Sequence, residues 1–316
     1  MYGHLKYSIY VVNQIATGSE KLIMTIFNMK KIITAAVVGI TLSGCGAGQE
    51  SVQRDVDLIA VDDRVVLVSK AAEEQNLQQL LFIDHSRLAK KEEAELAASR
   101  VALYSDIALN TDLIAQNTLV GLDLPFRVIS YAEDDLIKTM YTDAAFLQKR
   151  HNLSDTVALQ HFQTKVSELV KDIPDAQPVN SNVLSHNYGI IKIESEFDFE
   201  TTLSNIKRDV LKEGDTLWFI NLDYKAEAKK IGKSLPDATL LVFGAPAPGA
   251  TAMSDFPSIG LDAFGQKVLV YVEQGRVIVA YNDIVDMSQL HYQDNALAHR
   301  VINYRLGKTL SNAVEK

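Results

Sequence analysis

The stretch YTDAAFLQKRH at residues 141–151 recurs as YNDIVDMSQLH at residues 281–291, with Tyr, Asp and His in the same three places. An apolar strand-like run precedes each stretch, and each stretch continues with helix-like spacing. The pattern is therefore that of a hairpin that leads into a helix. Two interpretations arise: a catalytic signature that is used twice, or the same segment of one fold that is present twice.

Other segments repeat in register with this pair. Shifted by 139 positions, IDHSRLAKK at 83–91 falls on LDYKAEAKK at 222–230, and GLD at 121–123 falls on GLD at 260–262. One inserted residue then changes the shift to 140, which also aligns the two stretches above. Because the matches keep their register with a single slip, the sequence predicts a tandem duplication.

The order of predicted helices and hairpin-linked strands indicates an α+β fold class. We expect two tandem related domains, each a mostly antiparallel sheet packed against helices, which pair internally as a pseudo-dimer. The predicted boundaries are 1–28 for an upstream extension, 29–44 for a signal peptide, 45–53 for a tether, 54–153 for the first copy, 154–187 for a helix and linker, 188–295 for the second copy, and 296–316 for a C-terminal helix and tail.

Several local predictions follow from propensity and turn chemistry. The β-branched run RVVLVSK favours a strand, and residues rich in Ala, Lys, Glu and Leu favour a helix after Asp84. The predicted elements include a strand at 64–70, a helix at 85–99, hairpin turns at Asp134-Asp135 and Gln274-Gly275, a helix after an N-cap at Ser154 or Asp155, a loop after the strand that ends at Gly244, and one C-terminal helix at about 286–312.

Composition excludes some classes of protein. The chain has 316 residues, 47% hydrophobic and 22% charged, which is ordinary for a globular protein with two cores. Its formal net charge is −9 and it lacks a dense Lys/Arg run, so we expect no nucleic-acid partner. A single cysteine excludes an internal disulfide framework and a multi-Cys metal site, and we predict neither a metal nor another cofactor.

That cysteine, Cys45, ends an export signal. Residues 29–45, MKKIITAAVVGITLSGC, combine a basic start, a short apolar run and small residues before the cysteine. This order resembles a bacterial lipoprotein signal, in which the cysteine becomes the lipidated first residue of the mature protein. The alternatives are a buried core helix, which would have to reproduce this order by accident, and a membrane span, for which the run is too short.

The resemblance to a lipoprotein signal implies that the chain starts at Met29 and is held to a membrane by palmitate and related lipid at Cys45. In Gram-negative lipoproteins an Asp after the cysteine commonly signals retention in the inner membrane, and here that residue is Gly46. We therefore expect an outer-membrane location that faces the periplasm.

The second copy resembles the domain of unknown function family 302. The residues that carry the resemblance are SEFDFETTLSNIKRDVLKEG at 195–214, the segment through FGAPAPGATAM at 243–253, GLD at 260–262, and the hairpin that ends in YNDIVDMSQLH. The first copy is similar to the family at FIDHSRLAKK, GLDLPFRVISY and YTDAAFLQKRHNL. The resemblance implies a compact α+β domain that pairs with another copy, and it implies no activity.

The two copies depart from the family pattern in complementary ways. The first copy keeps the family's Asp-His pair as Asp84-His85, whereas the second has Asp223-Tyr224. The second copy keeps the strand-ending turn as FGAP, whereas the first has YSDI at 104–107. The first copy also lacks a recognisable helix before the strand LLFID at 80–84, because the residues VVLVSK have low helix propensity.

Four histidine and aspartate positions are candidate catalytic residues. His151 and His291 recur at equivalent places. Each is either a ligand or general base, or a residue that caps or packs a repeated helix, and we favour the second interpretation. Asp84 beside His85 is either an oriented base or an ordinary helix N-cap next to a surface residue, and we favour the cap.

The segment FGAPAPGATAM is the preferred rim of a ligand pocket, through Phe243, Gly244, Pro246 and Thr251. It either presents backbone N–H groups to an anion or small ligand, or is simply a structural turn. The two GLD aspartates, Asp123 and Asp262, would be catalytic only if they faced each other, and we expect them to fix the turn into each hairpin.

Two functions are compatible with these features. The first is a non-enzymatic cell-envelope lipoprotein that binds a small ligand or a protein partner. The second is an enzyme with one composite site, which joins His85 of the first copy to the 243–253 segment of the second. The composite site requires that these groups meet in a pocket open to solvent.

Overall fold

The computed structural model describes residues 46–154, 156–262 and 266–316. The upstream extension, the signal peptide and the lipidation residue Cys45 that the sequence predicts lie outside the described residues.

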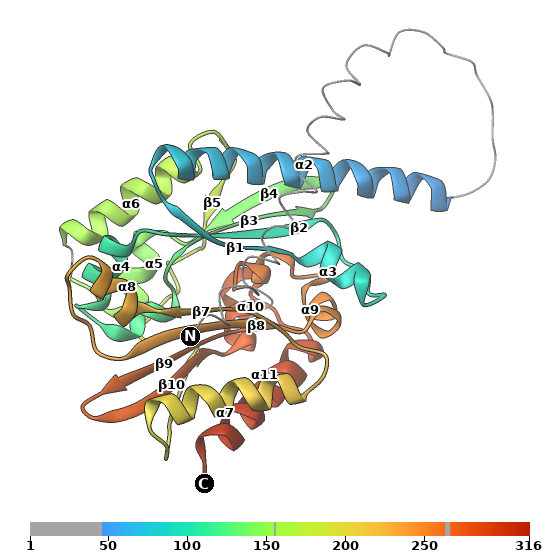
Figure 1. Cartoon of the computed structure of the whole chain (residues 1–316). Helices are drawn as coiled ribbons and strands as arrows, with labels where there is room; N and C mark the ends of the chain where they lie inside the picture. Colours follow the sequence, from blue (N-terminus) through green and yellow to red (C-terminus); the bar gives the residue numbers. More distant parts are fainter. Residues whose placement is uncertain (1–45, 155, 263–265) are drawn as a thin grey trace, which may run out of the picture. The chain divides into compact units, whose positions relative to one another are not determined.

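The first copy is built on one five-stranded sheet. Its strands are β1 (Gln78–Asp84), β2 (Ser99–Ser105), β3 (Phe126–Glu133), β4 (Leu136–Tyr141) and β5 (Gln177–Pro178). Its helices are α2 (Gly46–Glu74), α3 (His85–Lys91), α4 (Ile107–Ile114), the 3-10 helix η1 (Thr118–Leu122), α5 (Ala144–His151) and α6 (Val157–Leu169). Helices α2 and α6 lie along one face of this sheet (Figure 1).

The second copy repeats this order of elements. Its strands are β6 (Ile190–Glu194), β7 (Leu217–Asp223), β8 (Ala238–Gly244), β9 (Lys267–Glu273) and β10 (Arg276–Asn282). Its helices are α7 (Phe199–Lys212), α8 (Tyr224–Lys230), α9 (Pro246–Met253), the 3-10 helix η2 (Pro257–Asp262), α10 (Ile284–Tyr292) and α11 (Leu297–Val314). Helices α7 and α11 pack against each other on one face of the second sheet (Figure 1).

The strand orders show that the duplication extends to the sheets. They are β1-β2-β3-β4-β5 and β6-β10-β9-β8-β7. Neighbouring strands are antiparallel throughout the series from β1 to β4 and throughout the series from β7 to β10. A register irregularity between Gln79 and Leu81 has its counterpart between Trp218 and Ile220. A bulge that recurs at the same shift of 139 supports a common origin of the two copies.

Both predicted hairpin turns form where the sequence places them. Asp134 and Asp135 have φ values of 53° and 59°, and Gln274 and Gly275 have φ values of 52° and 78°. Two consecutive residues in the left-handed region are the geometry of a two-residue turn that matches the twist of its strands. The expected α+β tandem architecture is confirmed.

The predicted strand at 64–70 is wrong, because these residues lie inside helix α2. The helix buries Val61, Val65 and Val68, which lie on one helical face, and leaves Val66 63% exposed. The buried face packs on the sheet, so tertiary contact outweighs the weak helix propensity of β-branched residues. The first copy therefore does have a helix before β1, and residues 46–53 of the predicted tether at 45–53 belong to that helix too.

Smaller predictions also need correction. The predicted helix at 85–99 stops at Lys91, and the N-cap of α6 is Thr156 instead of Ser154 or Asp155. The expected loop after Gly244 is helix α9, and the single C-terminal helix is two helices, α10 and α11. Pro246 at the first position of α9 suits a helix start, where its missing N–H has no partner to lose.

One sheet edge distinguishes the two copies. In the second copy, β6 pairs with five residues of β10. In the first copy the equivalent edge of β4 pairs with the two-residue strand Gln177–Pro178, which comes from the predicted linker and runs parallel to it. Helix α2 occupies the chain segment that would otherwise supply the missing strand.

The two sheets share a core. One apolar cluster includes Ile83, Val101 and Ile129 of the first copy together with Leu240 and Leu269 of the second. A second cluster, between the second sheet and helices α7 and α11, includes Ile206, Val210 and Leu310. The shared cluster means that the two copies fold against each other.

The helical assignment of residues 64–70 is tested by two matched valine truncations. Val68 is 1% exposed, so we expect Val68→Ala to lower the free energy of unfolding by about 2 kcal/mol through lost packing. Val66→Ala should change it by less than about 0.5 kcal/mol. Urea denaturation measures both; equal effects would indicate that the two residues share one face, as they would in a strand.

Candidate functional site

The two copies exchange equivalent contacts across their interface. The ring of Tyr224 packs on Gly121, where an added Cβ would lie 2.9 Å from the ring, and the ring of His85 packs on Gly260, where an added Cβ would lie 3.0 Å away. These are matching positions of the duplication. The Tyr224 hydroxyl also donates to the Gly121 carbonyl oxygen, at 2.8 Å. The contacts are reciprocal, as in a two-fold symmetric dimer.

A buried charge cluster lies at this interface, and it consists of Asp123, Arg127, Arg150, His151, Asp262 and Lys267. The Asp123 carboxylate accepts from Arg150 at 2.8 Å and from His151 at 2.7 Å. It also lies 3.2 Å from Arg127 and 3.4 Å from Lys267 of the other copy. Every one of these side chains is buried.

The aspartates of the two GLD sequences share their cations. Lys267 lies 2.6 Å from Asp262 and 3.4 Å from Asp123. Arg127 likewise pairs with both carboxylates. Because Arg127 and Lys267 occupy equivalent places in the two copies, each copy supplies one aspartate and one cation. The expectation that the aspartates act only on their own hairpin turns is therefore incomplete, since they also join the copies.

Burial and charge act in opposite directions on these groups. Burial alone raises the pKa of Asp123, but Arg150, Lys267 and the hydrogen bond from His151 together hold that pKa well below its ordinary value. Burial also acts against ionised Asp262, yet Lys267 and Arg127 bring its pKa to about 2. Burial lowers the pKa of Lys267, and Arg127 lowers it further. Both aspartates are therefore ionised at neutral pH.

Of the two recurring histidines, His151 is buried and His291 is half-buried, and each contacts a polar side chain. His151 belongs to the charge cluster, and His291 Nδ1 lies 2.8 Å from the Ser258 hydroxyl. Burial lowers the pKa of His291 to about 4 and that of His85 to about 3. Burial also lowers the pKa of His151. All three side chains are thus neutral at pH 7.

Asp84 and His85 point to different surroundings. The Asp84 carboxylate caps helix α3 by accepting from the Arg87 backbone N–H at 2.8 Å, as the cap interpretation predicts. His85 is 0% exposed and faces the interface instead, where Ser99 lies 3.0 Å from its Nδ1. Helices α3 and α9 are in contact, but His85 is closed off by packing. The composite enzyme site therefore lacks the solvent access that it requires.

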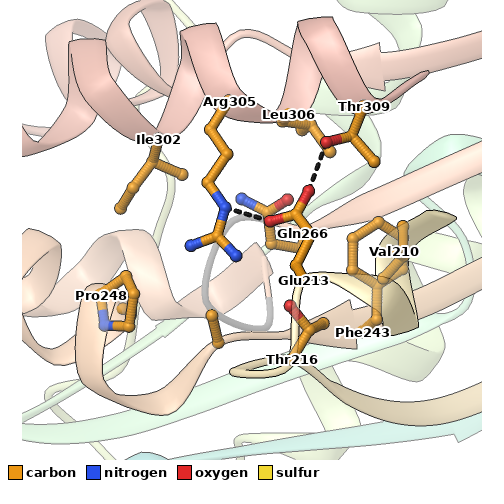
Figure 2. Close-up of a pocket in the computed structure, with 12 residues that line it drawn as sticks. Val210, Glu213, Thr216, Phe243, Pro248, Gln266, Ile302, Arg305, Leu306 and Thr309 are labelled. Atoms are coloured by element: carbon orange, nitrogen blue, oxygen red, sulfur yellow. Dashed lines mark hydrogen bonds and ion pairs between the residues drawn. The ribbon is translucent and has the colours of Figure 1, made fainter. Parts of the chain in front are cut away.

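A cavity lies beside the predicted ligand segment, between α7, α9 and α11 (Figure 2). Its volume is about 40 Å³. The lining residues are Val210, Glu213, Thr216, Phe243, Ala245, Pro248, Gly249, Gln266, Ile302, Arg305, Leu306 and Thr309. Of the four predicted ligand residues, Phe243 lines this cavity, whereas Gly244, Pro246 and Thr251 are not among its lining.

Charged side chains in the cavity are paired with one another. Arg305 forms ion pairs with Glu213 and with Asp215, the latter at 2.7 Å from Nη1, and Thr309 donates to Glu213. The hydrogen bond to Asp215 is the main reason that the pKa of Arg305 is raised. Figure 2 shows the Arg305 and Glu213 side chains facing each other, with the Gln266 amide next to them.

Gln266 is the unusual polar group of this cavity. It is 7% exposed as a residue, and its side-chain amide forms no hydrogen bond with a described residue; the amide is not among the fully buried unpartnered groups and is open to the cavity. The start of α9 does not compensate with backbone donors. Pro246 and Pro248 have no N–H, and the Gly249 N–H already donates to the Ala245 oxygen at 2.8 Å. The hypothesis that this segment presents N–H groups to an anion is not supported.

In the first copy, aromatic side chains occupy the place that corresponds to this cavity. At a shift of 140, Phe126 and Phe162 correspond to Gln266 and Ile302, and their rings stack with centroids 4.5 Å apart. Lys165, the counterpart of Arg305, pairs with the cap residue Asp106 at 3.1 Å. The cavity of the second copy thus corresponds in position to an aromatic pair of the first copy.

The described residues contain neither a membrane-spanning helix nor a metal-binding cluster. Within residues 46–154, 156–262 and 266–316, no helix combines the length and apolar character that a membrane crossing needs. The same residues contain no group of three or more His, Cys, Asp or Glu side chains arranged to hold a metal ion.

The fold and interface define a class of protein with two tandem α+β domains that share one buried face. The chain belongs to the family described as "Domain of unknown function DUF302", whose model matches residues 52–173 and 191–316. The predicted resemblance is confirmed for both copies. The matched regions also include α6 and α11, which the sequence-based boundaries of 54–153 and 188–295 left outside the domains.

Curated relatives are similar to parts of the chain. "Fluoride-specific ion channel FluC 1" of Brucella suis biovar 1 (strain 1330) is 28% identical over 203 residues, which cover 62% of this chain and 78% of the relative. "Fluoride-specific ion channel FluC 1" of Brucella abortus biovar 1 (strain 9-941) is 28% identical over 127 residues, or 40% of this chain. The chain spans about half the length of this second relative, 46%.

Among solved structures, the chain is similar to an uncharacterized conserved protein DUF302 from Bacillus stearothermophilus. The sequence identity is 16% and the TM-score is 0.33, over 40% of this chain and 95% of that chain.

Sequence reasoning missed the cations of the interface and the polar groups of the cavity. Arg127 and Lys267 follow the two GLD sequences at matching positions of the repeat, and this recurrence was a usable signal. Arg150 has Leu290 as its counterpart, so no repetition marks it. Gln266 and Arg305 are far apart in sequence and become neighbours only through β9 and α11.

The role of the charge cluster is tested by Asp123→Asn. The change leaves the guanidinium groups of Arg127 and Arg150 buried with less compensation, so we expect the free energy of unfolding to fall by about 3–5 kcal/mol. Asp134→Asn is the matched control, because its pair with Lys138 is exposed and worth less than about 1 kcal/mol. Equal losses in urea denaturation would contradict the proposed role.

The buried histidines predict a loss of stability in acid. The unfolded chain binds protons at histidine near pH 6.5, whereas native His291 and His85 resist protonation down to about pH 4 and about pH 3. Unfolding therefore takes up protons below pH 6.5, and each of the two groups should cost about 2 kcal/mol between pH 8 and pH 5. His291→Gln should remove the contribution of one histidine to the change in the free energy of unfolding with pH. If the free energy of unfolding of this variant depends on pH as steeply as that of the unchanged protein, the prediction for His291 is wrong.

Proposed function

We propose that this chain is a lipid-anchored binding protein of a bacterial cell envelope, with a binding site in its second domain. The observation that carries the binding role is the cavity between α7, α9 and α11, which opens where the first copy has a stacked aromatic pair. The export signal at 29–45 supports the location, and Gly46 after the cysteine favours the outer membrane, facing the periplasm.

The burial of the histidines supports binding without catalysis. General acid–base work needs a titratable group that reaches the reacting atoms, but His85 and His151 are enclosed in packed interior and the half-buried His291 is hydrogen-bonded to Ser258. In the cavity, Glu213 and Arg305 are ion-paired with each other, which holds the walls in place. Such a site is suited to recognising a small group rather than transforming it.

The binding role is tested by a thermal-shift screen of metabolites and small peptides with the full chain. A ligand at 100 times its dissociation constant adds about 2.7 kcal/mol to the stability of the native state. The control is Ile302→Phe, which places a ring in the cavity as Phe162 does in the first copy. A hit that is lost in this variant supports the proposal. A screen without hits, or hits that the variant retains, counts against the cavity as the site.

The location predicts the behaviour of a cysteine variant. Cys45→Ala should abolish labelling by a radioactive or clickable fatty acid and release the protein from the membrane fraction, because the acyl chains attach at that residue. Ser43→Ala is the matched control, since it keeps a small residue before the cysteine and should stay in the membrane. Unchanged fractionation of Cys45→Ala would remove the lipoprotein proposal.

A further inference from the structure

The side-chain amide of Gln266 is a hydrogen-bonding group that faces a cavity. Its exposed fraction is 7%, and no described residue provides a hydrogen bond to it. The donor and acceptor of this amide are open to the cavity, whereas the first copy has the apolar ring of Phe126 at this position. Where the first copy has a ring stack, the second copy thus presents an amide that can bind a polar group.

The cavity limits the size of what Gln266 can meet. A volume of about 40 Å³ is room for roughly three water molecules, and drug-sized ligands need several times more. The occupant is therefore a small head group. A shallow depression lined by Asp209, Lys212 and Asn312 shares Glu213 and Thr309 with the cavity, so the remainder of a larger ligand has a surface on which to lie.

The charges and donors around the cavity exclude an ionic head group. Arg305 is held by Glu213 and Asp215, so an anion would have to break these pairs and would meet two carboxylates. A cation would meet the Arg305 guanidinium, and the carboxylates of Glu213 and Asp215 are already engaged by that side chain. A neutral group avoids both penalties.

We propose that Gln266 binds a primary carboxamide, with its own N–H donating to the ligand oxygen and its own oxygen accepting from the ligand N–H. A carboxamide offers one strong acceptor and two donors on adjacent atoms, which is the complement of a glutamine amide. Phe243, Leu306 and Ile302 give the apolar wall for the carbon that carries the amide. The source is either a free small amide or an Asn or Gln side chain of a peptide.

This inference rests on the proposed binding function. Saturation-transfer difference NMR on the full chain, with acetamide as the probe, tests it directly. We expect signal from the acetamide methyl protons with millimolar affinity, and at least a tenfold weaker signal from acetate, which has the same shape but carries a charge. Competition by acetyl-Gly-Asn-Gly-amide that is stronger than competition by acetamide assigns the peptide source; weaker competition assigns the free amide.

Two glutamine variants decide whether Gln266 is responsible. Gln266→Leu should lose the acetamide signal while its melting temperature stays close to that of the unchanged protein, because the amide has no protein hydrogen bond to lose. Gln289→Leu makes the same change at an exposed position on α10 and should keep the signal. If Gln266→Leu fails to fold, Ile302→Phe replaces it as the variant that closes the cavity.

The outcomes separate this inference from the proposed function. Equal binding of acetate, no acetamide signal, or a signal that survives in Gln266→Leu would overturn the carboxamide assignment. If the metabolite screen nevertheless gives a ligand that is lost in Ile302→Phe, the binding function stands and its ligand belongs to another class. If both experiments are negative, the proposed binding function fails together with the inference.

Discussion

The carboxylate of Asp123 is the contact on which the arrangement of the two domains depends. It accepts from Arg150 and His151 of its own copy and lies near Lys267 of the other. Removing a carboxylate from water costs free energy, and here charged and polar partners from two domains replace the water molecules that would hydrate it. The domains must therefore stay together, because separating them would leave several of these charges without partners.

The shared face and the outer faces of the two copies have diverged to different degrees. On the shared face, each change must suit a residue of the other copy, as His85 does beside Gly260 and Tyr224 does beside Gly121. On the outer faces each copy packs only against its own helices. There the first copy has a stacked aromatic pair, and the second has Gln266 and a cavity. The second copy's outer face could thus acquire a binding role without disturbing the pairing.

The sequence predicted features that depend on short-range chemistry. The turns at 134–135 and 274–275 follow from residues that tolerate left-handed backbone, and the cap at Asp84 follows from a short carboxylate before a helix. The sequence-based prediction failed at 64–70. The β-branched residues there favour a strand in isolation, but in the folded protein they belong to a helix, one face of which packs on a sheet. The sequence also did not predict the place of Gln266, since nothing near that residue in the chain indicates that its amide faces a cavity.

The sequence by itself determined the duplication, the fold class, the family and the residues from which the export proposal comes. These are encoded in order and spacing along the chain, which a repeat preserves. Only the tertiary structure decided that the GLD aspartates share cations, that His85 and His151 are enclosed, and that a cavity opens beside Phe243. Each of these depends on which side chains meet across β9, α9 and α11. Packing and desolvation act on such neighbours in space, and the order of residues along the chain does not specify them.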